Sequence, residues 1–418
     1  MKKYENYKDS GLEWLGMVPE HWEIMKVKYI CNVTDGTHFS PATISDGKPY
    51  ITVSNVKDDF IDIESAGRIS IADFNELVKQ GCQPKTGDVL LAKDGTVGRT
   101  AIVKDNDYVV LSSLGILSPN DNLTSSYLKY MLDSSFLQEQ MNEAMAGSAL
   151  RRITITKIKD FMALLPSISE QRTIASYLDH KVGQIDALIS EKEKMVEDLK
   201  AYRSSLITET VTKGLDKGVE VKDSGVEWIG KIPQNWKLLK LKRIVNLKSG
   251  TSLTSDRILD EGKYQVFGGN GPRGYIDDYT NEGNIVLIGR QGALCGNINY
   301  ANGKFWATEH AIICYPLKEI DTIWLGETLR AMNLNQYSIS AAQPGLAVER
   351  INELLIPTPS ISEQKEISSY LKLKITQIES AISEQEHQLS DLKSYKSSLI
   401  TEAVTGKIDL RDWQTKKS

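Results

Sequence analysis

The chain has 418 residues, of which 25% are charged and 40% hydrophobic, and its formal net charge is −5. This length allows two or three domains with cores of their own. No apolar run approaches the ~18 residues that a membrane-spanning helix needs, and the charged start lacks the apolar core of a signal peptide. We therefore expect a cytoplasmic protein that binds no membrane. Four cysteines without CxxC spacing predict reduced thiols and no metal site.

A module containing two tryptophans opens the chain and returns in its second half. Residues 9–16 read DSGLEWLG and are followed by Pro19 and Trp22, and residues 223–230 read DSGVEWIG and are followed by Pro233 and Trp236. A repeat of this size indicates a domain duplication rather than a solenoid. We predict an entry module over 1–28 and a linker with a second entry module over 215–242.

Residues 29–165 have short β-like runs, broken by Gly, Asp and Pro, and one predicted helix over 125–145. Residues 87–95 (GDVLLAKDG) resemble a strand that ends in a glycine turn carrying a cation and a polar side chain. We interpret the loop over 93–96 as one suited to reading DNA sequence, although a hairpin with solvated charges would give the same pattern. Its candidate DNA-binding residues are Thr37, His38, Lys93, Asp94, Thr96, Arg99, Arg151 and Arg152.

Residues 166–214 are predicted to form one long helix. The helix opens with PSISEQ, in which Ser167 and Glu170 have capping-box spacing, and ends with AYRSSLITE before Gly214. The same pattern returns 193 positions later over 359–406, with PSISEQ, SYKSSLITE and Gly406. Residues 407–418 form a C-terminal tail.

Residues 243–358 form the second divergent middle. Residues 267–271 (FGGNG) fit the glycine pattern with which adenine methyltransferases hold S-adenosylmethionine, but more loop follows them, and no NPPY-like tetrapeptide accompanies them. We interpret them as a surface loop able to read base edges, Arg toward guanine and Asn toward adenine, with an ordinary β-turn as the alternative. The candidate residues are Asn270, Arg273, Tyr275, Arg290, Gln291 and Arg350.

Apolar residues shared by the two long helices alternate at steps of four and three, the spacing of a coiled-coil seam. We predict that the helices pack antiparallel as a stalk between the two domains, rather than docking separately on two cores. The predicted packing residues are Leu178, Val182, Ile185, Ile189, Val196, Leu199, Leu206, Leu371, Ile375, Ile378, Ile382, Leu389, Leu392 and Leu399.

No sequence motif indicates catalysis. There is no Walker A loop, no HExxH and no nucleophile elbow. The charges argue against strong DNA binding by the chain alone, because residues 29–165 carry 13 lysines and arginines against 17 acidic residues, and residues 243–358 carry 10 against 12.

The order of these repeats resembles the specificity subunit of type I restriction-modification enzymes. The resemblance covers nearly the whole chain and is carried by the PSISEQ helix starts, the SSLITE helix ends and the DSGxEWxG entry modules. It implies a mixed α/β fold of two target recognition domains separated by two long antiparallel helices.

The resemblance also implies a function, in which each domain reads one half of a split DNA sequence and the helices set the gap. The partners it implies are double-stranded DNA, two modification subunits that use S-adenosylmethionine, and two restriction subunits that use ATP and magnesium. This chain itself would hold no cofactor and have no catalytic residue. Two alternatives stay open: a coiled-coil adaptor with two protein-binding heads, and a single-chain DNA methyltransferase.

Overall fold

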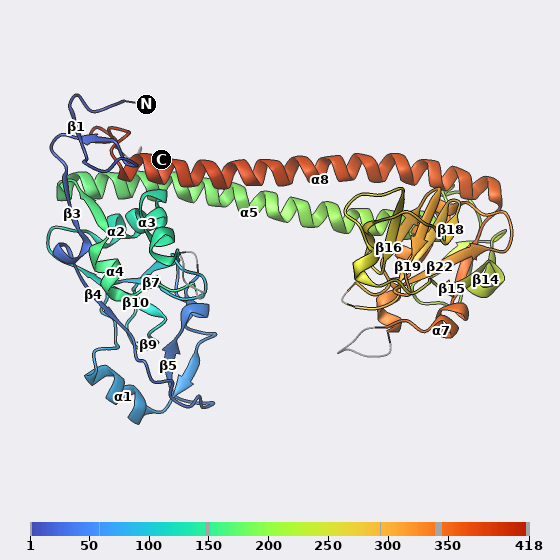
Figure 1. Ribbon diagram of the computed structural model, residues 1–418, viewed down its shortest axis with the longest axis horizontal. Coiled ribbons are helices and arrows are strands. Elements are labelled where there is room, and N and C mark those ends of the chain that lie inside the picture. The colour runs from blue at the N-terminus through green and yellow to red at the C-terminus, as the bar shows by residue number, and fades with distance from the viewer. Residues whose placement is uncertain (1, 58, 147–150, 293, 339–344, 415–418) are drawn as a thin grey trace. The chain divides into compact units, whose positions relative to one another are not determined.

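A computed structural model describes residues 2–57, 59–146, 151–292, 294–338 and 345–414. The chain divides into two compact units, which are residues 1–192 with 387–418, and residues 193–386. The predicted α/β class with two long helices is confirmed (Figure 1). The units do not end at the predicted domain boundaries, since each unit takes part of both long helices.

The two long helices are α5 (Ile168–Lys213) and α8 (Ile361–Val404). Each begins after a capping serine, whose hydroxyl accepts a hydrogen bond from the backbone N–H of Glu170 or Glu363 at 3.3 Å. Each ends at a glycine in the left-handed region, with φ of 74° at Gly214 and 70° at Gly406. The predicted start and stop signals therefore act as helix caps.

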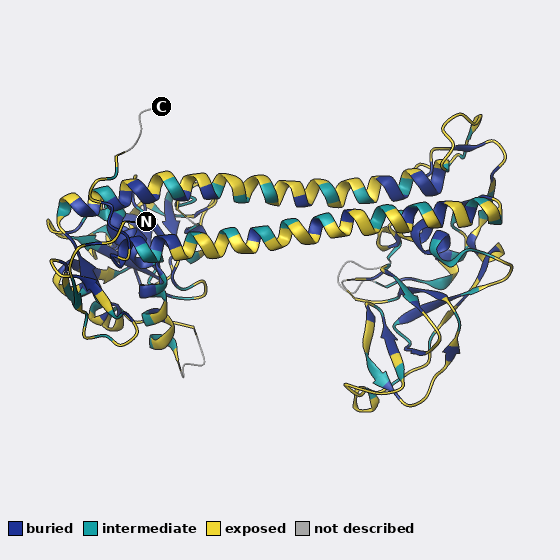
Figure 2. Ribbon diagram, turned by 90° about the horizontal axis from the view of Figure 1, so that it is seen from above, coloured by how far each residue is buried: buried dark blue, intermediate teal, exposed yellow. Residues whose placement is uncertain are grey.

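Within each unit the helices run antiparallel and pack against one another. In the first unit the Lys396 ammonium lies 2.7 Å from the Asp186 carboxylate. In the second unit Arg203 pairs with Glu379 at 3.2 Å, and Lys200 pairs with Glu386 at 3.1 Å. All fourteen predicted seam residues are buried or half-buried, and Figure 2 shows buried positions recurring along both helices between exposed ones. The helices thus share a seam, and their ends also pack into the cores of the two units.

The first unit is built on an antiparallel sheet in the order β4-β10-β7-β8, beside a three-stranded sheet in the order β6-β5-β9. Helices α2 and α3 lie between the core sheet and the long helices, and α1 lies near the far strands (Figure 1). The elements of the core sheet and its helices are β4 (Cys31–Asp35), β7 (Val89–Ala92), β8 (Thr100–Ile102), β10 (Leu114–Pro119), α2 (Ser125–Asp133) and α3 (Ser135–Met145).

The first unit has further strands and helices outside its core sheet. Strand β3 pairs with β11 where the chain enters and leaves the domain. The elements are β1 (Tyr7–Asp9), β2 (Met17–Pro19), β3 (Glu23–Lys26), β5 (Lys48–Ile51), β6 (Gly67–Ile69), α1 (Ile71–Lys79), β9 (Val109–Val110), α4 (Ile155–Asp160) and β11 (Met162–Leu165).

The second unit has the same core-sheet topology, and its neighbouring sheet has an additional strand, β18. Its core sheet has the order β15-β22-β19-β20, and the neighbouring sheet has the order β17-β16-β21-β18. The elements are β12 (Val221–Asp223), β13 (Lys231–Pro233), β14 (Lys237–Lys240), β15 (Val245–Ser249), β16 (Tyr264–Gly268), β17 (Gly271–Ile276), β18 (Asn281–Glu282), β19 (Ile285–Gly289), β20 (Ile298–Ala301), β21 (Lys304–Ala307), β22 (Ala311–Pro316), α6 (Thr322–Ala331), α7 (Val348–Asn352) and β23 (Leu355–Thr358).

The helix predicted over 125–145 is in fact two helices. Ser134 lies between α2 and α3 with extended backbone angles, φ −69° and ψ 152°. Its hydroxyl donates to the Met131 carbonyl at 2.6 Å, which satisfies a group at the end of α2. Serine competes for backbone groups in this way, so a short serine-rich stretch can break an otherwise helical pattern.

The second tryptophan of each entry module packs against the ends of the long helices. The Trp22 ring is fully buried, and its Nε1 donates to the Glu170 carboxylate at the start of α5 at 3.4 Å. A Cβ placed on Gly406, at the end of α8, would lie 3.3 Å from the same ring. In the second unit Trp236 donates to Glu363 at 3.1 Å and borders Gly214. Each tryptophan therefore contacts the start of one long helix and the end of the other.

The carboxylates at these contacts are held in their charged form. Burial alone would raise the pKa of Glu170, but hydrogen bonds from His21, Ser167 and Trp22 hold this pKa below its ordinary value. The pKa of Glu363 is lowered against burial by bonds from Ser360 and Trp236. Because both pKa values are depressed by folding, the stability they contribute is present above the ordinary pKa of a glutamate and is lost as the pH falls below it.

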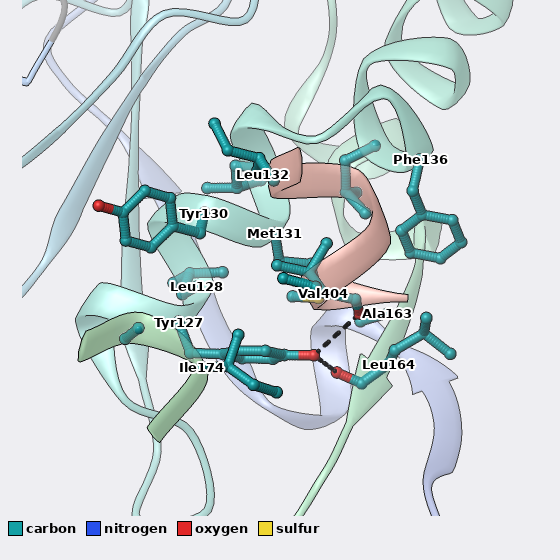
Figure 3. Close-up of a cluster of buried hydrophobic side chains, with 14 of the residues drawn as sticks. Tyr127, Leu128, Tyr130, Met131, Leu132, Phe136, Ala163, Leu164, Ile174 and Val404 are labelled. Carbon is teal, nitrogen blue, oxygen red and sulfur yellow. Dashed lines mark hydrogen bonds between the residues drawn. The ribbon is translucent and has the colours of Figure 1, made fainter. Parts of the chain in front are cut away.

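A buried tyrosine strengthens the end of α8 in the first unit. Figure 3 shows the Tyr127 hydroxyl between the Leu164 and Val404 carbonyls, to which it is hydrogen-bonded at 3.1 and 3.3 Å. Leu128, Met131 and Val404, the last residue of α8, belong to the same buried hydrophobic cluster. The last turn of α8 is thus part of the domain core.

We predict that Gly406→Ala destabilises the protein by about 2 kcal/mol or more, because its φ is left-handed and a Cβ would lie 2.4 Å from Pro19 Cδ. Gly214→Ala should cost less, since its nearest neighbour is the edge of Trp236 at 3.1 Å. Gly183→Ala is the matched control. It lies inside α5 with nothing within 4 Å of its Cβ position, and it should stabilise the helix by up to about 1 kcal/mol.

Denaturant unfolding followed by circular dichroism measures all three variants. Equal effects of Gly406→Ala and Gly183→Ala would contradict the tight contact at the end of α8.

Candidate nucleic-acid interface

Both core sheets end in loops that are held by the same backbone hydrogen bonds. In the first unit, the Lys93 N–H donates to the Ser113 carbonyl at 2.8 Å, and the Ile153 N–H donates to the Lys93 carbonyl at 2.9 Å. In the second unit, Arg290 donates to His310 at 2.8 Å, and Leu346 donates to Arg290 at 2.9 Å. Residues 93–96 and 290–292 therefore occupy equivalent places in the two units.

A glycine lets a further loop approach each of these loops. A Cβ on Gly36 would lie 2.0 Å from the Val110 carbonyl oxygen, and one on Gly250 would lie 2.3 Å from that of Ala307. This close approach allows a backbone hydrogen bond from the residue that follows each glycine. The Thr37 N–H donates to the Val110 carbonyl at 3.0 Å, and the Thr251 N–H donates to the Ala307 carbonyl at 2.9 Å. Each unit thus gathers three loops at one end of its core sheet.

The first unit holds charged groups at this end, but they are paired with one another. The Lys93 ammonium lies 2.9 Å from Asp35 Oδ2 and its side chain is only 2% exposed. The imidazole of His38 lies 3.5 Å from the same oxygen and is 70% exposed. The Thr37 hydroxyl donates to the Phe39 carbonyl and accepts from the Phe39 N–H. Lys93 and Thr37 are thus buried side chains whose polar groups bind within the domain, Lys93 to Asp35 and Thr37 to the Phe39 backbone.

The remaining candidates of the first unit lie in two places. Arg152 Nε is 3.1 Å from Asp94 Oδ1, and a β-bridge joins these two residues, so they lie beside the Lys93 loop. Arg151 and Thr96 are exposed. Arg99 lines a different hollow of about 330 Å³, where Lys129, Asp133 and Lys393 also lie. The structure does not group Arg99 with Asp35 and His38.

The second unit brings three of its predicted residues together. Asn270, Arg273 and Gln291 line one open hollow of about 390 Å³, together with Gly269, Pro272, Leu294 and His310. Asn270 comes from the turn between β16 and β17, Arg273 from β17, Gln291 from the loop after β19, and His310 from the loop before β22. The glycine-rich segment is therefore the end of a β-hairpin, and β17 rather than a helix follows it.

His310 was not predicted, although it is central to this hollow. Its Nδ1 lies 3.1 Å from Gln291 Oε1. Its place is the one that Ser113 occupies in the first unit, as the paired backbone bonds show. The sequence gives one weak signal, a histidine directly before the buried strand 311–316.

The other candidates of the second unit lie outside the hollow. Tyr275 is half-buried in β17 opposite Gln265. Arg290 is half-buried and anchors its loop through the backbone. The Arg350 guanidinium lies 5.8 Å from the centre of the Tyr337 ring, and the side chain is exposed.

The part of the chain that the structure describes holds neither a cluster of metal ligands nor a membrane-spanning helix. Across 2–57, 59–146, 151–292, 294–338 and 345–414, no group of three or more His, Cys, Asp or Glu residues could hold a metal ion. Within the same ranges, no helix combines the length and apolarity needed to cross a membrane.

Comparison with known proteins gives a consistent result. Residues 19–198 and 233–387 each match the family model described as the type I restriction modification DNA specificity domain. The chain is 23% identical to the type I restriction enzyme MjaVIII specificity subunit of Methanocaldococcus jannaschii, over 98% of this chain and 97% of that one. It is 42% identical to the EcoprrI specificity subunit of Escherichia coli, over 31% of this chain and 34% of that one.

A solved structure supports the fold over the same extent. A chain from a study of complex assembly and conformational transition of the type I R-M system superimposes with a TM-score of 0.71 at 16% identity, and the match covers 94% of this chain and 99% of the other.

Proposed function

The chain belongs to the type I restriction-modification DNA specificity family, and we propose that its two units each read one half of a bipartite, asymmetric DNA site. As a specificity subunit it is the DNA-recognition chain of its complex and not the enzyme. One observation carries the proposal. The same backbone bonds hold loops of different chemistry in the two units, with Lys93, Asp94 and Ser113 in the first and Arg290, Gln291 and His310 in the second.

Loops at the end of a rigid sheet suit base recognition. Each loop is fixed to its neighbours by main-chain bonds, so the side chains that differ between the units can change without altering the sheet. Base edges in the major groove distinguish all four base pairs by donors and acceptors. Arg151, Arg152 and Arg350 are exposed near these loops in sequence, and we assign them to phosphate contacts that orient the domain.

We predict that replacing residues 29–165 with the middle of another family member changes one half-site only, and that replacing 243–358 changes only the other. Each middle begins and ends near a short two-stranded pairing, β3 with β11 or β14 with β23, so the exchange leaves the helices intact. Sequencing of methylated host DNA reads the result. An exchange that alters both half-sites would contradict separate reading by the two units.

The long helices are proposed to set the gap between the half-sites. Helices α5 and α8 have 46 and 44 residues, and each runs without interruption from one unit into the other. A continuous helix rises by about 1.5 Å per residue, so its length is a fixed spacer. The buried seam and the ion pairs within each unit keep the two helices in register.

We predict that four residues inserted after Lys192 in α5 and after Glu386 in α8 lengthen the gap by roughly one or two base pairs. The insertion adds about 6 Å and a net turn of about 40°, close to the rise and twist of one to two base pairs, and a coiled coil accommodates it as a stutter. The same four residues inserted at exposed Lys217 are the control and should leave the gap unchanged. A changed half-site with an unchanged gap would refute the spacer.

The outer face of the helices is proposed to dock two copies of one partner, the modification subunit. Residues 201–207 and 394–400 have the same sequence of exposed, half-buried and buried positions. The repeated tyrosines, Tyr202 and Tyr395, are 56% and 51% exposed. The seam does not use them, so packing within this chain does not explain why both copies keep a tyrosine.

We expect Tyr202→Ala and Tyr395→Ala each to weaken one of two equivalent docking sites, and the double variant to weaken both. Exposed aromatic side chains are strong contributors to protein interfaces, and their loss typically costs 1 kcal/mol or more of binding. Leu188→Ala is the control, because Leu188 is also exposed on α5 but its repeat position holds Ala381.

The mass of the complex purified with its modification subunits measures the outcome. Complexes of unchanged mass at limiting concentrations would rule out these tyrosines as docking residues. In this scheme S-adenosylmethionine, and ATP with magnesium, belong to the partner subunits, with two restriction subunits completing the assembly.

A further inference from the structure

The hollow of the second unit presents hydrogen-bond donors and no carboxylate. Among the described residues that line it, the polar side chains are Asn270, Arg273, Gln291 and His310. Glu309 is adjacent, but its carboxylate accepts the Leu253 N–H at 3.3 Å and lies 3.6 Å from His310 Nε2. In the first unit the residue that corresponds to Gln291 is Asp94, whose carboxylate lies 3.1 Å from Arg152 Nε.

The orientation of Asn270 is set by a neighbouring asparagine. Asn297 Nδ2 donates to Asn270 Oδ1 at 2.8 Å. The amide oxygen is therefore engaged, and the NH₂ group is left without a partner among the residues that the structure describes. A bidentate pairing with adenine would need this oxygen and the NH₂ group together, so the free group of Asn270 is suited to donating alone.

The orientation of Gln291 is set by His310. Gln291 Oε1 has no proton, so His310 Nδ1 must donate across their 3.1 Å contact, which fixes a proton on Nδ1. The oxygen of Gln291 is then hydrogen-bonded to His310, and its NH₂ group is left to donate to another partner. Two amides of this hollow are thus turned to offer N–H groups.

The aliphatic part of the Arg273 side chain packs against Gly268. A Cβ on Gly268 would lie 2.5 Å from Arg273 Cδ and 3.1 Å from its Cγ, so the Arg273 stem occupies the space that a side chain at 268 would fill. Gly268 faces Gly271 across the hairpin, next to the bulge in β16. The guanidinium has five N–H donors in a fixed fork and no acceptor. Arg273 is exposed, and no described residue pairs with it.

A set of donors selects one base above the others. Guanine presents two neighbouring acceptors in the major groove, O6 and N7, which an arginine fork binds at once. Adenine and cytosine each present an amino group in the groove, and the guanidinium of Arg273 has no acceptor for it. Resting on the proposed function, we infer that the half-site read by residues 243–358 contains a guanine, that Arg273 reads it, and that Asn270 and Gln291 donate to neighbouring base acceptors.

The test uses the purified complex of this chain with its modification subunits. Competition among duplexes that differ at single base pairs of this half-site gives the preference at each position. For Arg273→Ala we expect the preference for guanine to fall roughly 5- to 150-fold at one base pair, the range of a lost bidentate contact. Gly268→Ala, which displaces the Arg273 stem, should lower the preference at the same base pair.

Pro272→Ala is the control, because Pro272 lines the same hollow without a donor and should leave the preference unchanged. A half-site without any guanine-selective position would overturn the inference. So would an Arg273→Ala variant that binds every duplex less tightly by the same factor, since this is the behaviour of a phosphate contact.

Failure of this inference is distinguishable from failure of the proposed function. If exchange of residues 243–358 moves neither half-site, the proposed function fails. If the exchange moves one half-site and that half-site has no guanine read through Arg273, only the inference about the base fails.

Discussion

The contact between each entry-module tryptophan and the ends of the two long helices is the constraint on which the rest of the structure depends. Trp22 bonds to Glu170 at the start of α5 and packs on Gly406 at the end of α8. Trp236 repeats this contact with Glu363 and Gly214. A helix start and a helix end are thereby fixed side by side in each unit, which sets the register of the seam. Each core sheet follows within ten residues of its tryptophan, so the recognition loops are attached to the helix ends by a short, packed segment.

Duplication explains how one chain can carry two different specificities. The main-chain bonds that fix Lys93 in the first unit fix Arg290 in the second, and Gly36 and Gly250 allow the same close approach. Side chains around these bonds are free to differ. The first unit pairs Asp35 with Lys93, and the second pairs Gln291 with His310. The middles also carry an excess of acidic residues, so most non-specific affinity for DNA has to come from partner chains that neutralise phosphates.

The sequence predicted the parts of the structure that depend on local signals. Capping serines, left-handed glycines and the four-three spacing of apolar residues identified α5 and α8 to within two residues at each end. It could not show that Lys93 is buried, because that depends on Asp35, which lies 58 positions earlier. His310 was missed for the same reason, since its partner Gln291 and the hairpin carrying Arg273 come from other loops. Local patterns fix helices, whereas a recognition surface is assembled from distant segments.

The most direct measurement of the central claim is sequencing of N6-methyladenine in the host genome with and without this gene. Reading by two separate units predicts that one motif loses its methylation when the gene is removed. That motif should consist of two unlike half-sites separated by a gap of fixed length and unspecified sequence. Loss of methylation at a continuous or palindromic motif, or no change at any motif, would contradict the account.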